Sequence, residues 1–439
     1  MSELLDLAQR VVRQAQALGA QEVVASVGKS ISTTITRRDG KVEQATESTS
    51  RGLSFSVLVD NRFSSHGTSD LRPDAISEFI KQAIAATRIL EQDPERALPE
   101  APLCGRGATA AALDVLDSAY NARSAEARAT DAELLEQTAE KANIPSVISR
   151  SSQVADGCSQ TARVDSNGFS DTHEDAWFMW GAEATFQEGG KRPEVSSYFG
   201  ARYLTDLPEP QKIAQQLEDR ARERAGSKPI DSGSYPLILL NRATGKLLGA
   251  FGGPLAGSAL HEQRSCLAGK LGSRVGSAKF TLLDDPTIPR GLASRPWDGE
   301  GLIARPFPVV SEGVLDSYYI NVYYGRKLGM KPTTGGRSNW VIPPGDQSWE
   351  AIAKAYPKAI LVDGFLGGNS NATSGDFSFG IRGALIEHGV RTQAISEMNV
   401  SGNLTDIFEK LVEIANDPYR YSSVVSPTLV FEDVRFSGT

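Results

Sequence analysis

Histidine and cysteine, which supply many of the metal ligands and nucleophiles in proteins, are scarce in this sequence. Its 439 residues include only four histidines and three cysteines. The cysteines (Cys104, Cys158 and Cys266) are odd in number and widely spaced, and no two form a CxxC pair. This usage fits a reducing compartment and excludes a disulfide framework.

Long apolar runs and an excess of basic residues are also absent. No segment approaches the roughly 18 consecutive apolar residues of a membrane span, and the N-terminus lacks the basic-then-apolar pattern of a signal peptide. The formal net charge of -8 disfavours binding of nucleic acid, which favours a basic face. We therefore expect a cytoplasmic protein with neither a nucleic-acid nor a membrane partner.

The length predicts more than one domain, because a chain of 439 residues exceeds what one hydrophobic core normally supports. The clearest boundary lies where Gly226-Ser-Lys-Pro229 and Ser232-Gly-Ser234 follow a polar helical segment. We predict an N-terminal domain over residues 1–226 and a C-terminal domain over residues 235–439.

The two predicted domains differ in their patterns. In the first, helical spacing alternates with strand-like runs that are separated by turn residues such as Asp39-Gly40, Asp60-Asn61 and Ser166-Asn167-Gly168. Helices are expected over 4–18, 76–84, 124–142 and 209–225, and strands over 23–27, 31–35, 53–59 and within 147–204. The second has short apolar runs punctuated by glycine. The predicted fold class is α+β, with an N-terminal antiparallel sheet and helices followed by a mostly-β C-terminal domain.

The stretch from Leu237 to Phe251 is the first candidate for a functional site. Four apolar residues read as a buried strand, and a helix is expected to begin at Asn241. A strand that leads into a helix often carries catalytic side chains. Here the polar residues are Asn241, Arg242 and Lys246, and the two cations cannot act as the neutral or anionic ligands that a divalent metal requires.

A second candidate is the glycine-rich strand segment Leu361 to Gly389. Glycine within strands allows another backbone to approach closely, and a sheet edge can then accept an extended peptide through main-chain hydrogen bonds. We name Thr373, Ser374, Gly375, Asp376 and Phe377 as candidate peptide-binding residues. The alternative is that these glycines only turn corners.

The segment His261-Glu-Gln-Arg-Ser-Cys266 offers a competing metal site. His261, Glu262 and Cys266 are all capable of metal ligation. However, residues five positions apart on a regular helix point about 140° away from each other, so this site needs a distorted helix and a further ligand. A histidine at the surface or in the core is the simpler interpretation.

Several blocks of the sequence together resemble the TldD/PmbA family, once called modulators of DNA gyrase. The resemblance rests on Lys327 to Gly336, Gly364 to Gly389, Ser396 to Leu404, Asn416-Asp417 and Ser426 to Gly438, and extends more weakly to Gly52–Asn61 and Ser65–Leu71. It implies two branches that pair in the cytoplasm as a peptide-cleaving complex. In the TldD branch an HExxxH motif and a late cysteine hold zinc, and the glutamate acts as general base.

The resemblance places that motif on Asn241-Arg-Ala-Thr-Gly-Lys246. Asn241 and Lys246 stand in place of the histidines and Arg242 in place of the glutamate, while the region of the late cysteine is Tyr421-Ser-Ser-Val. This pattern is that of the PmbA (TldE) branch. No metal is therefore expected in this chain, and zinc is expected in its partner. The buried cations would need a carboxylate such as Asp376, Glu397 or Asp363.

The resemblance thus implies a PmbA/TldE-like subunit that forms a heterodimer with a TldD-like metallopeptidase and admits extended peptides to the partner's zinc. Processing of modified peptides and turnover of unfolded antitoxins are the implied activities. Three alternatives stay open at this point: a stand-alone metal-dependent hydrolase that uses His261, Glu262 and Cys266, a binding-only gyrase modulator, and a homodimer that forms when the partner is absent.

Overall fold

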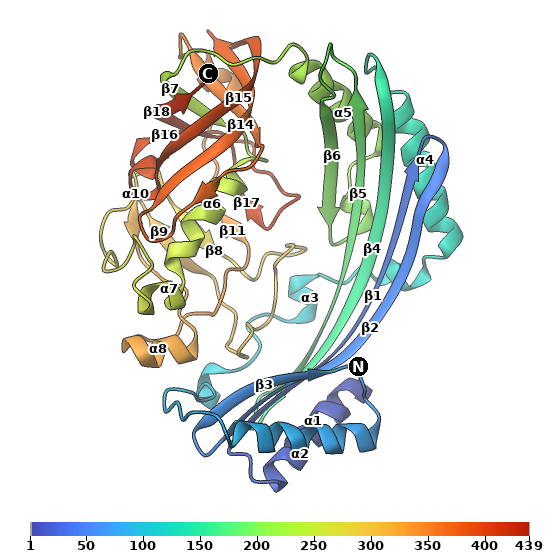
Figure 1. Cartoon of the computed structure of the whole chain (residues 1–439), viewed down its shortest axis with the longest axis vertical. Coiled ribbons are helices and arrows are strands. Elements are labelled where there is room, and N and C mark those ends of the chain that lie inside the picture. The colour runs from blue at the N-terminus through green and yellow to red at the C-terminus, as the bar shows by residue number, and fades with distance from the viewer. Residues whose placement is uncertain (1, 439) are drawn as a thin grey trace.

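The computed structural model describes residues 2–438 and consists of two halves that face each other (Figure 1). The N-terminal half is built on an antiparallel six-stranded sheet with the order β3-β2-β1-β4-β5-β6. Its strands are β1 (Glu22–Arg38), β2 (Lys41–Val59), β3 (Arg62–Thr68), β4 (Val147–Asp165), β5 (Ser170–Phe186) and β6 (Glu194–Ala201). Its longer helices are α1 (Ser2–Ala17), α2 (Pro73–Thr87), α4 (Ala125–Glu140) and α5 (Pro210–Arg224).

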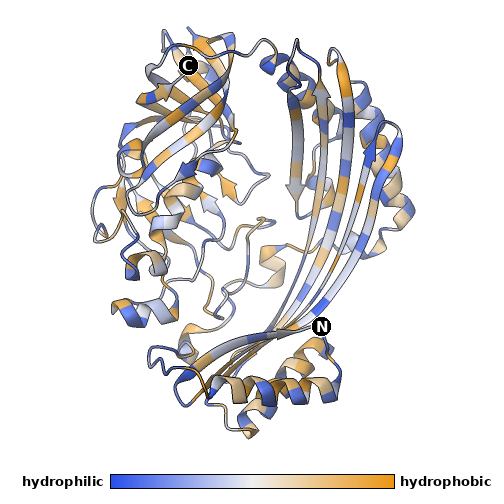
Figure 2. Cartoon of the chain, viewed as in Figure 1, coloured by the Kyte–Doolittle hydropathy of each residue, from blue (hydrophilic) through white to orange (hydrophobic). Residues whose placement is uncertain are grey.

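The two faces of this sheet have different roles because side chains alternate along a strand. Apolar residues at alternate positions, such as Val23, Ala25 and Phe55, point to one face and are buried against α1 and α2 at one end of the sheet. Farther along the strands, Ile35, Val154 and other buried residues pack against α4 and α5. Figure 2 shows this alternation of apolar and polar residues along the long strands, and Figure 1 shows the helices at the two ends of the sheet.

The C-terminal half contains two sheets and short helices. The larger sheet includes β7 (Gly233–Leu239), β12 (Ala359–Phe365), β13 (Asn369–Ser370), β14 (Asp376–Glu387), β15 (Val390–Asn403), β16 (Leu411–Ile414) and β18 (Leu429–Ser437). Pairing of β12 with β14 closes it into a barrel-like form. The smaller sheet contains β8 (Leu282–Asp284), β9 (Phe307–Ser311), β10 (Val314–Leu315), β11 (Trp340–Val341) and β17 (Val424–Val425).

Helices α6 (Thr244–Gly252), α7 (Gly257–His261), α8 (Val322–Leu328), α9 (Trp349–Ala353) and α10 (Leu404–Ile407) lie around these sheets, and the short α3 (Ala110–Leu113) belongs to the N-terminal half. The core of the C-terminal half includes the rings of Phe251, Phe280 and Phe408, and the last two stack with centroids 4.2 Å apart. Aromatic packing of this kind stabilises a core beyond simple burial.

The predicted fold class is confirmed: an N-terminal antiparallel sheet with helices precedes a mostly-β C-terminal half. Helix α5 ends at Arg224 and β7 begins at Gly233, so residues 225–232 connect the two halves, and the predicted start of the second domain at residue 235 lies within β7. None of the helices within residues 2–438 combines the length and the apolar character of a membrane span.

Candidate functional site

The segment from Leu237 to Phe251 forms a strand, a turn and a helix. Helix α6 begins at Thr244, so the prediction of a helix start at Asn241 is wrong by three residues, and residues 241–243 form the turn. The side-chain amide of Asn241 donates to the backbone oxygen of Asp417 at 2.7 Å. Its Oδ1 accepts from the backbone N–H of Arg242 at 2.6 Å. One end of this amide is thus held within the turn and the other by Asp417, which is distant in sequence.

Arg242 lies beside a buried carboxylate. Its Nη2 is 3.6 Å from Oδ2 of Asp363, and its Nε donates to the Asp363 backbone oxygen at 3.2 Å. Arg382 donates from Nε to the other carboxylate oxygen of Asp363 at 2.8 Å. The Asp363 side chain is only 9% exposed, so the two guanidiniums stabilise a charge that burial alone would disfavour. Of the three carboxylates predicted as partners, Asp363 is the one beside Arg242.

The other two predicted partners are engaged elsewhere. Glu397 forms an exposed ion pair with Lys191 at 2.6 Å. Asp376 accepts a hydrogen bond from the side chain of Asn403 at 2.9 Å. The assignment of Glu397 or Asp376 as the partner of Arg242 is therefore wrong, because their strand positions direct them to other neighbours.

A β-bulge explains why Asp363 reaches both arginines. In the pairing of β12 with β14, Val362 lies opposite Gly383 and Gly364 lies opposite Arg382, so Asp363 is the extra residue. A bulge of this kind re-aims a side chain out of the regular alternation. A Cβ at Gly364 would lie 2.4 Å from Nη2 of Arg382, so a larger residue there would have to shift the Arg382 side chain.

Lys246 is exposed on α6, so the expectation that it is a buried cation is wrong, and its neighbour is an aromatic ring. Its Nζ lies 4.9 Å from the ring centroid of Phe379, within the range of a cation–π interaction. Phe379 stacks in turn on Phe377, with centroids 5.2 Å apart. The structure thus brings Lys246 close to the candidate peptide-binding residues on β14.

The residues at the motif position do not fit a zinc ion. A zinc site needs imidazole, thiolate or carboxylate ligands, whereas this position presents an amide and two cationic side chains. The amide of Asn241 is hydrogen-bonded to the backbones of Asp417 and Arg242, and Arg242 is directed at Asp363. These three side chains therefore do not form a zinc site.

Two arginines that the sequence did not single out complete this cluster. Arg220 and Arg224 lie four residues apart on α5, and the cavity that they line also includes Asp363 and Arg382. Arg220 donates to the backbone oxygen of Ser196 and Arg224 to that of Glu194. The spacing of four residues in Arg220-Ala-Arg-Glu-Arg224 places both side chains on one helix face. This spacing is the sequence signal that could have identified the two arginines.

The candidate peptide-binding residues span the tight turn after β13 and the first two residues of β14. Thr373, Ser374 and Asp376 are exposed, while Phe377 is buried in the core. Oδ1 of Asn371 accepts from the backbone N–H of Thr373 at 2.9 Å. At Phe377, β14 pairs with β13 on one side and β15 on the other, so an added strand at this position would have to displace β13. The exposed turn itself stays available for contact.

The three residues of the competing metal site have separate environments. His261 is the last residue of α7, and its ring lies 5.9 Å from that of Tyr324. Glu262 forms an ion pair with Arg264. Cys266 packs against the core, and burial raises the pKa of its thiol, which disfavours the thiolate form that binds metals. Across residues 2–438, no three His, Cys, Asp or Glu side chains form a group that could hold a metal ion.

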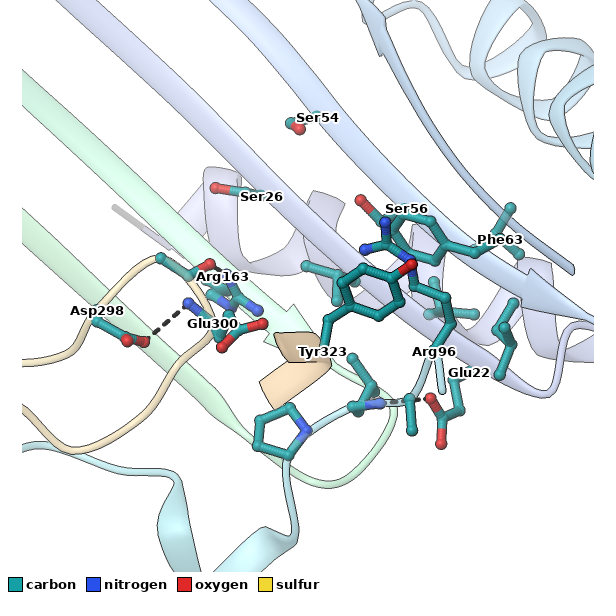
Figure 3. A pocket seen from close by; sticks show the side chains of 18 of the residues that line it. Glu22, Ser26, Ser54, Ser56, Phe63, Arg96, Arg163, Asp298, Glu300 and Tyr323 are labelled. Atoms are coloured by element: carbon teal, nitrogen blue, oxygen red, sulfur yellow. Dashed lines mark hydrogen bonds between the residues drawn. The ribbon is translucent and has the colours of Figure 1, made fainter. Parts of the chain in front are cut away.

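A separate cleft of about 480 Å³ lies on the polar face of the N-terminal sheet. Figure 3 shows Ser26, Ser54 and Ser56 along one wall, and loop residues such as Glu300 come from the C-terminal half. Tyr323 and Phe63 enclose the Arg96 guanidinium, which lies 3.5 and 4.7 Å from their ring centroids. This volume lies in the range of small-molecule and peptide side-chain sites.

Family models match two parts of the chain. Residues 232–438 match the PmbA/TldA metallopeptidase C-terminal domain, and residues 23–87 match the PmbA/TldA metallopeptidase domain 1. The metalloprotease PmbA of Escherichia coli O157:H7 is 25% identical over 424 residues, which cover 94% of this chain and 91% of that protein.

Solved structures match the whole chain. A Bacteroides thetaiotaomicron protein named for modulation of DNA gyrase is 34% identical, with a TM-score of 0.95 and complete coverage of both chains. TldE from Thermococcus kodakarensis shares the fold, with a TM-score of 0.86 at 19% identity over 98% of this chain and 100% of that one.

Proposed function

The chain belongs to the PmbA/TldD metallopeptidase family, and on this basis we propose that it acts as a subunit of the PmbA (TldE) type that holds no metal. Its partner is a TldD-like metallopeptidase, with which it forms a cytoplasmic heterodimer. The partner supplies zinc and hydrolysis, and this chain supplies part of the surface that receives an extended peptide. Peptide maturation and removal of unfolded proteins are the activities that such a complex performs.

The contacts of Arg242 carry this proposal. The family motif needs a carboxylate general base at this position, and a guanidinium cannot accept a proton from water at neutral pH. Arg242 also has a structural role, because it compensates the buried charge of Asp363 across the β12–β14 bulge. This contact supports a structural role for Arg242 over a role in hydrolysis.

The surface between the two halves supports the peptide-receiving role. The cleft has hydroxyl groups on one wall and aromatic rings on another, so it offers both hydrogen bonds and apolar contact. An unfolded peptide presents free backbone N–H and C=O groups that such a surface can bind, whereas a folded protein has already paired most of them.

The test is hydrolysis of an unfolded peptide by three samples: this chain, a TldD-like homologue from the same organism, and their mixture. We expect cleavage in the mixture only. Full activity of the homologue alone would remove the subunit role, and metal-dependent activity of this chain alone would favour the hydrolase that uses His261, Glu262 and Cys266.

A matched pair of variants then locates the peptide. Ser54→Trp fills the cleft, whereas Ser48→Trp places the same ring on an exposed part of β2 away from it. Both variants should co-purify with the partner, and only Ser54→Trp should slow cleavage. Equal rates for the two variants would exclude the cleft from peptide binding.

A further inference from the structure

Four arginine side chains converge at the junction between α5 and the β12–β14 pair. Arg220 and Arg224 come from the N-terminal half, and Arg242 and Arg382 come from the C-terminal half. Arg220, Arg224, Arg382 and Asp363 line one narrow cavity, and Arg242 reaches Asp363 from its other side. The junction is thus rich in positive charge.

The negative charge at this junction is smaller. Asp363 is the carboxylate that contacts Arg242 and Arg382. Glu223 also lines the cavity, but its Oε1 is 3.1 Å from Nη2 of Arg391, so a fifth arginine uses its charge. Within residues 2–438, these two carboxylates are the only acidic residues that line the cavity.

Some of the guanidinium nitrogens are buried without an acceptor. Among the described residues, Nε of Arg220 is inaccessible to solvent and has no hydrogen-bond partner, and Nη2 of Arg242, also inaccessible, has only its 3.6 Å ion pair with Asp363. Burial, with the repulsion of Arg242 and Arg382, lowers the pKa of Arg220 to about 10. The side chain therefore stays charged at neutral pH. A buried, charged donor without a partner is costly, so an anion at this place would stabilise the fold.

We propose that this cavity is a binding site for a compact anion, which supplies the missing negative charge and joins the two halves. Arginine forks suit this role, because their N–H groups hold carboxylate and phosphate oxygens in a fixed geometry. The enclosed space is about 10 Å³, close to the volume that one water-sized atom needs. The site therefore takes a halide ion or a single oxygen of a carboxylate or phosphate. The remaining atoms of an oxyanion would lie beside Arg382, which lines the cavity and is partly exposed.

This site is independent of the subunit role, so it is tested on the full-length chain alone. The thermal midpoint is measured while sodium chloride, acetate or phosphate is added from an anion-poor buffer. A ligand that binds only the folded state raises the midpoint with its concentration. We expect a saturable rise of several degrees for the wild type, and the anion that acts at the lowest concentration distinguishes a halide site from an oxyanion site.

Two variants and one control separate the site from general effects of salt. Arg220→Gln and Arg224→Gln each remove one charge from the cavity without touching Asp363, and Arg10→Gln removes one from the exposed face of α1. The cavity variants should lose at least half of the anion-dependent rise, and Arg10→Gln should retain it. Parallel responses of all four proteins, or no rise in the wild type, would overturn the proposal.

Discussion

At the scale of single residues, Asp363 connects the sequence motif to the fold. It compensates Arg242 from the turn after β7 and Arg382 from β14, and its own charge is nearly inaccessible to solvent. Removal of one member of a buried ion pair is costly because the remaining charge loses its partner.

Asp363→Asn should therefore destabilise the protein strongly. We expect a loss of about 3 kcal/mol in the free energy of unfolding, at the lower end of the usual range because both arginines reach solvent at one edge. Urea denaturation provides the measurement. Asp433→Asn is the matched control, since Asp433 forms an exposed ion pair with Lys410, and no measurable change in the free energy of unfolding is expected there. Equal losses for both variants would show that Asp363 has no special role.

Glu300 gives the structure a dependence on pH. Its carboxylate lies at the cleft and accepts a hydrogen bond from the backbone N–H of Val322, and burial raises its pKa above the ordinary value of 4.5. Folding therefore favours the protonated form. The associated stability is fully present below about pH 4.5 and is lost as the pH rises through the folded-state pKa.

Glu300→Gln should thus raise the free energy of unfolding at pH 8 and leave it nearly unchanged at pH 4.5, because glutamine never pays the cost of burying a charge. Urea denaturation at the two pH values measures this difference. Glu78→Gln, at an exposed position of α2, should show no such contrast. A stabilisation of equal size at both pH values would contradict the role of ionisation.

The sequence alone predicted only part of this site. The resemblance located Asn241, Arg242 and Lys246, and the need of a buried cation for a counter-charge placed Asp363 among three candidates. It could not choose Asp363, because the choice depends on a bulge that forms only when β12 pairs with β14. Arg220 and Arg224 were missed because their importance comes from the approach of two halves that are distant in sequence.

At the scale of elements, the β12–β14 pair depends on close backbone contact at Gly383. A Cβ at this position would lie 1.8 Å from the backbone oxygen of Leu361, a distance that no small adjustment of a side chain relieves. Gly383→Ala should lower the free energy of unfolding by more than about 2 kcal/mol, because the strands must separate. Thermal unfolding is the measurement.

Gly249→Ala is the control for this substitution. Gly249 lies on α6, and a Cβ there meets no atom within 4 Å, so the higher helix propensity of alanine should stabilise the protein by up to about 1 kcal/mol. A shift of the thermal midpoint in the same direction for both alanine variants would contradict this account, because the close backbone approach at Gly383 would then not determine the stability of the β12–β14 pair.

Helices were easier to predict from the sequence than strands. The four longer N-terminal helices lie where they were expected. For α1, α2 and α4 the signal was apolar spacing, because one buried face is sufficient to produce that pattern, whereas α5 was expected as a polar helix. In contrast, β1 runs without a break through Gly28, which pairs with Gly52 on β2. The stretch from Lys41 to Arg51 is a strand although it is exposed, so it lacks the alternation that identifies a half-buried strand.

At the scale of the whole molecule, polar contacts join the two halves at several places. Arg163 of β4 donates to the backbone oxygen of Gly299 at 2.5 Å, and Arg202, which follows β6, donates to that of Leu292 at 2.7 Å. Together with the arginine cluster at α5, these contacts hold the sheet opposite the C-terminal half (Figure 1). The contacts between the halves thus fix the position of the cleft relative to residues 241–246.

The central claim is that a guanidinium–carboxylate network occupies the position at which the family's metallopeptidase motif would hold zinc. The most direct test is the zinc content of the purified full-length chain after equilibrium dialysis against zinc, measured by mass spectrometry beside a TldD-like homologue. The account predicts about one zinc per homologue chain and far less than one per chain of this protein. One tightly held zinc per chain of this protein, lost on His261→Ala or Cys266→Ala, would contradict it.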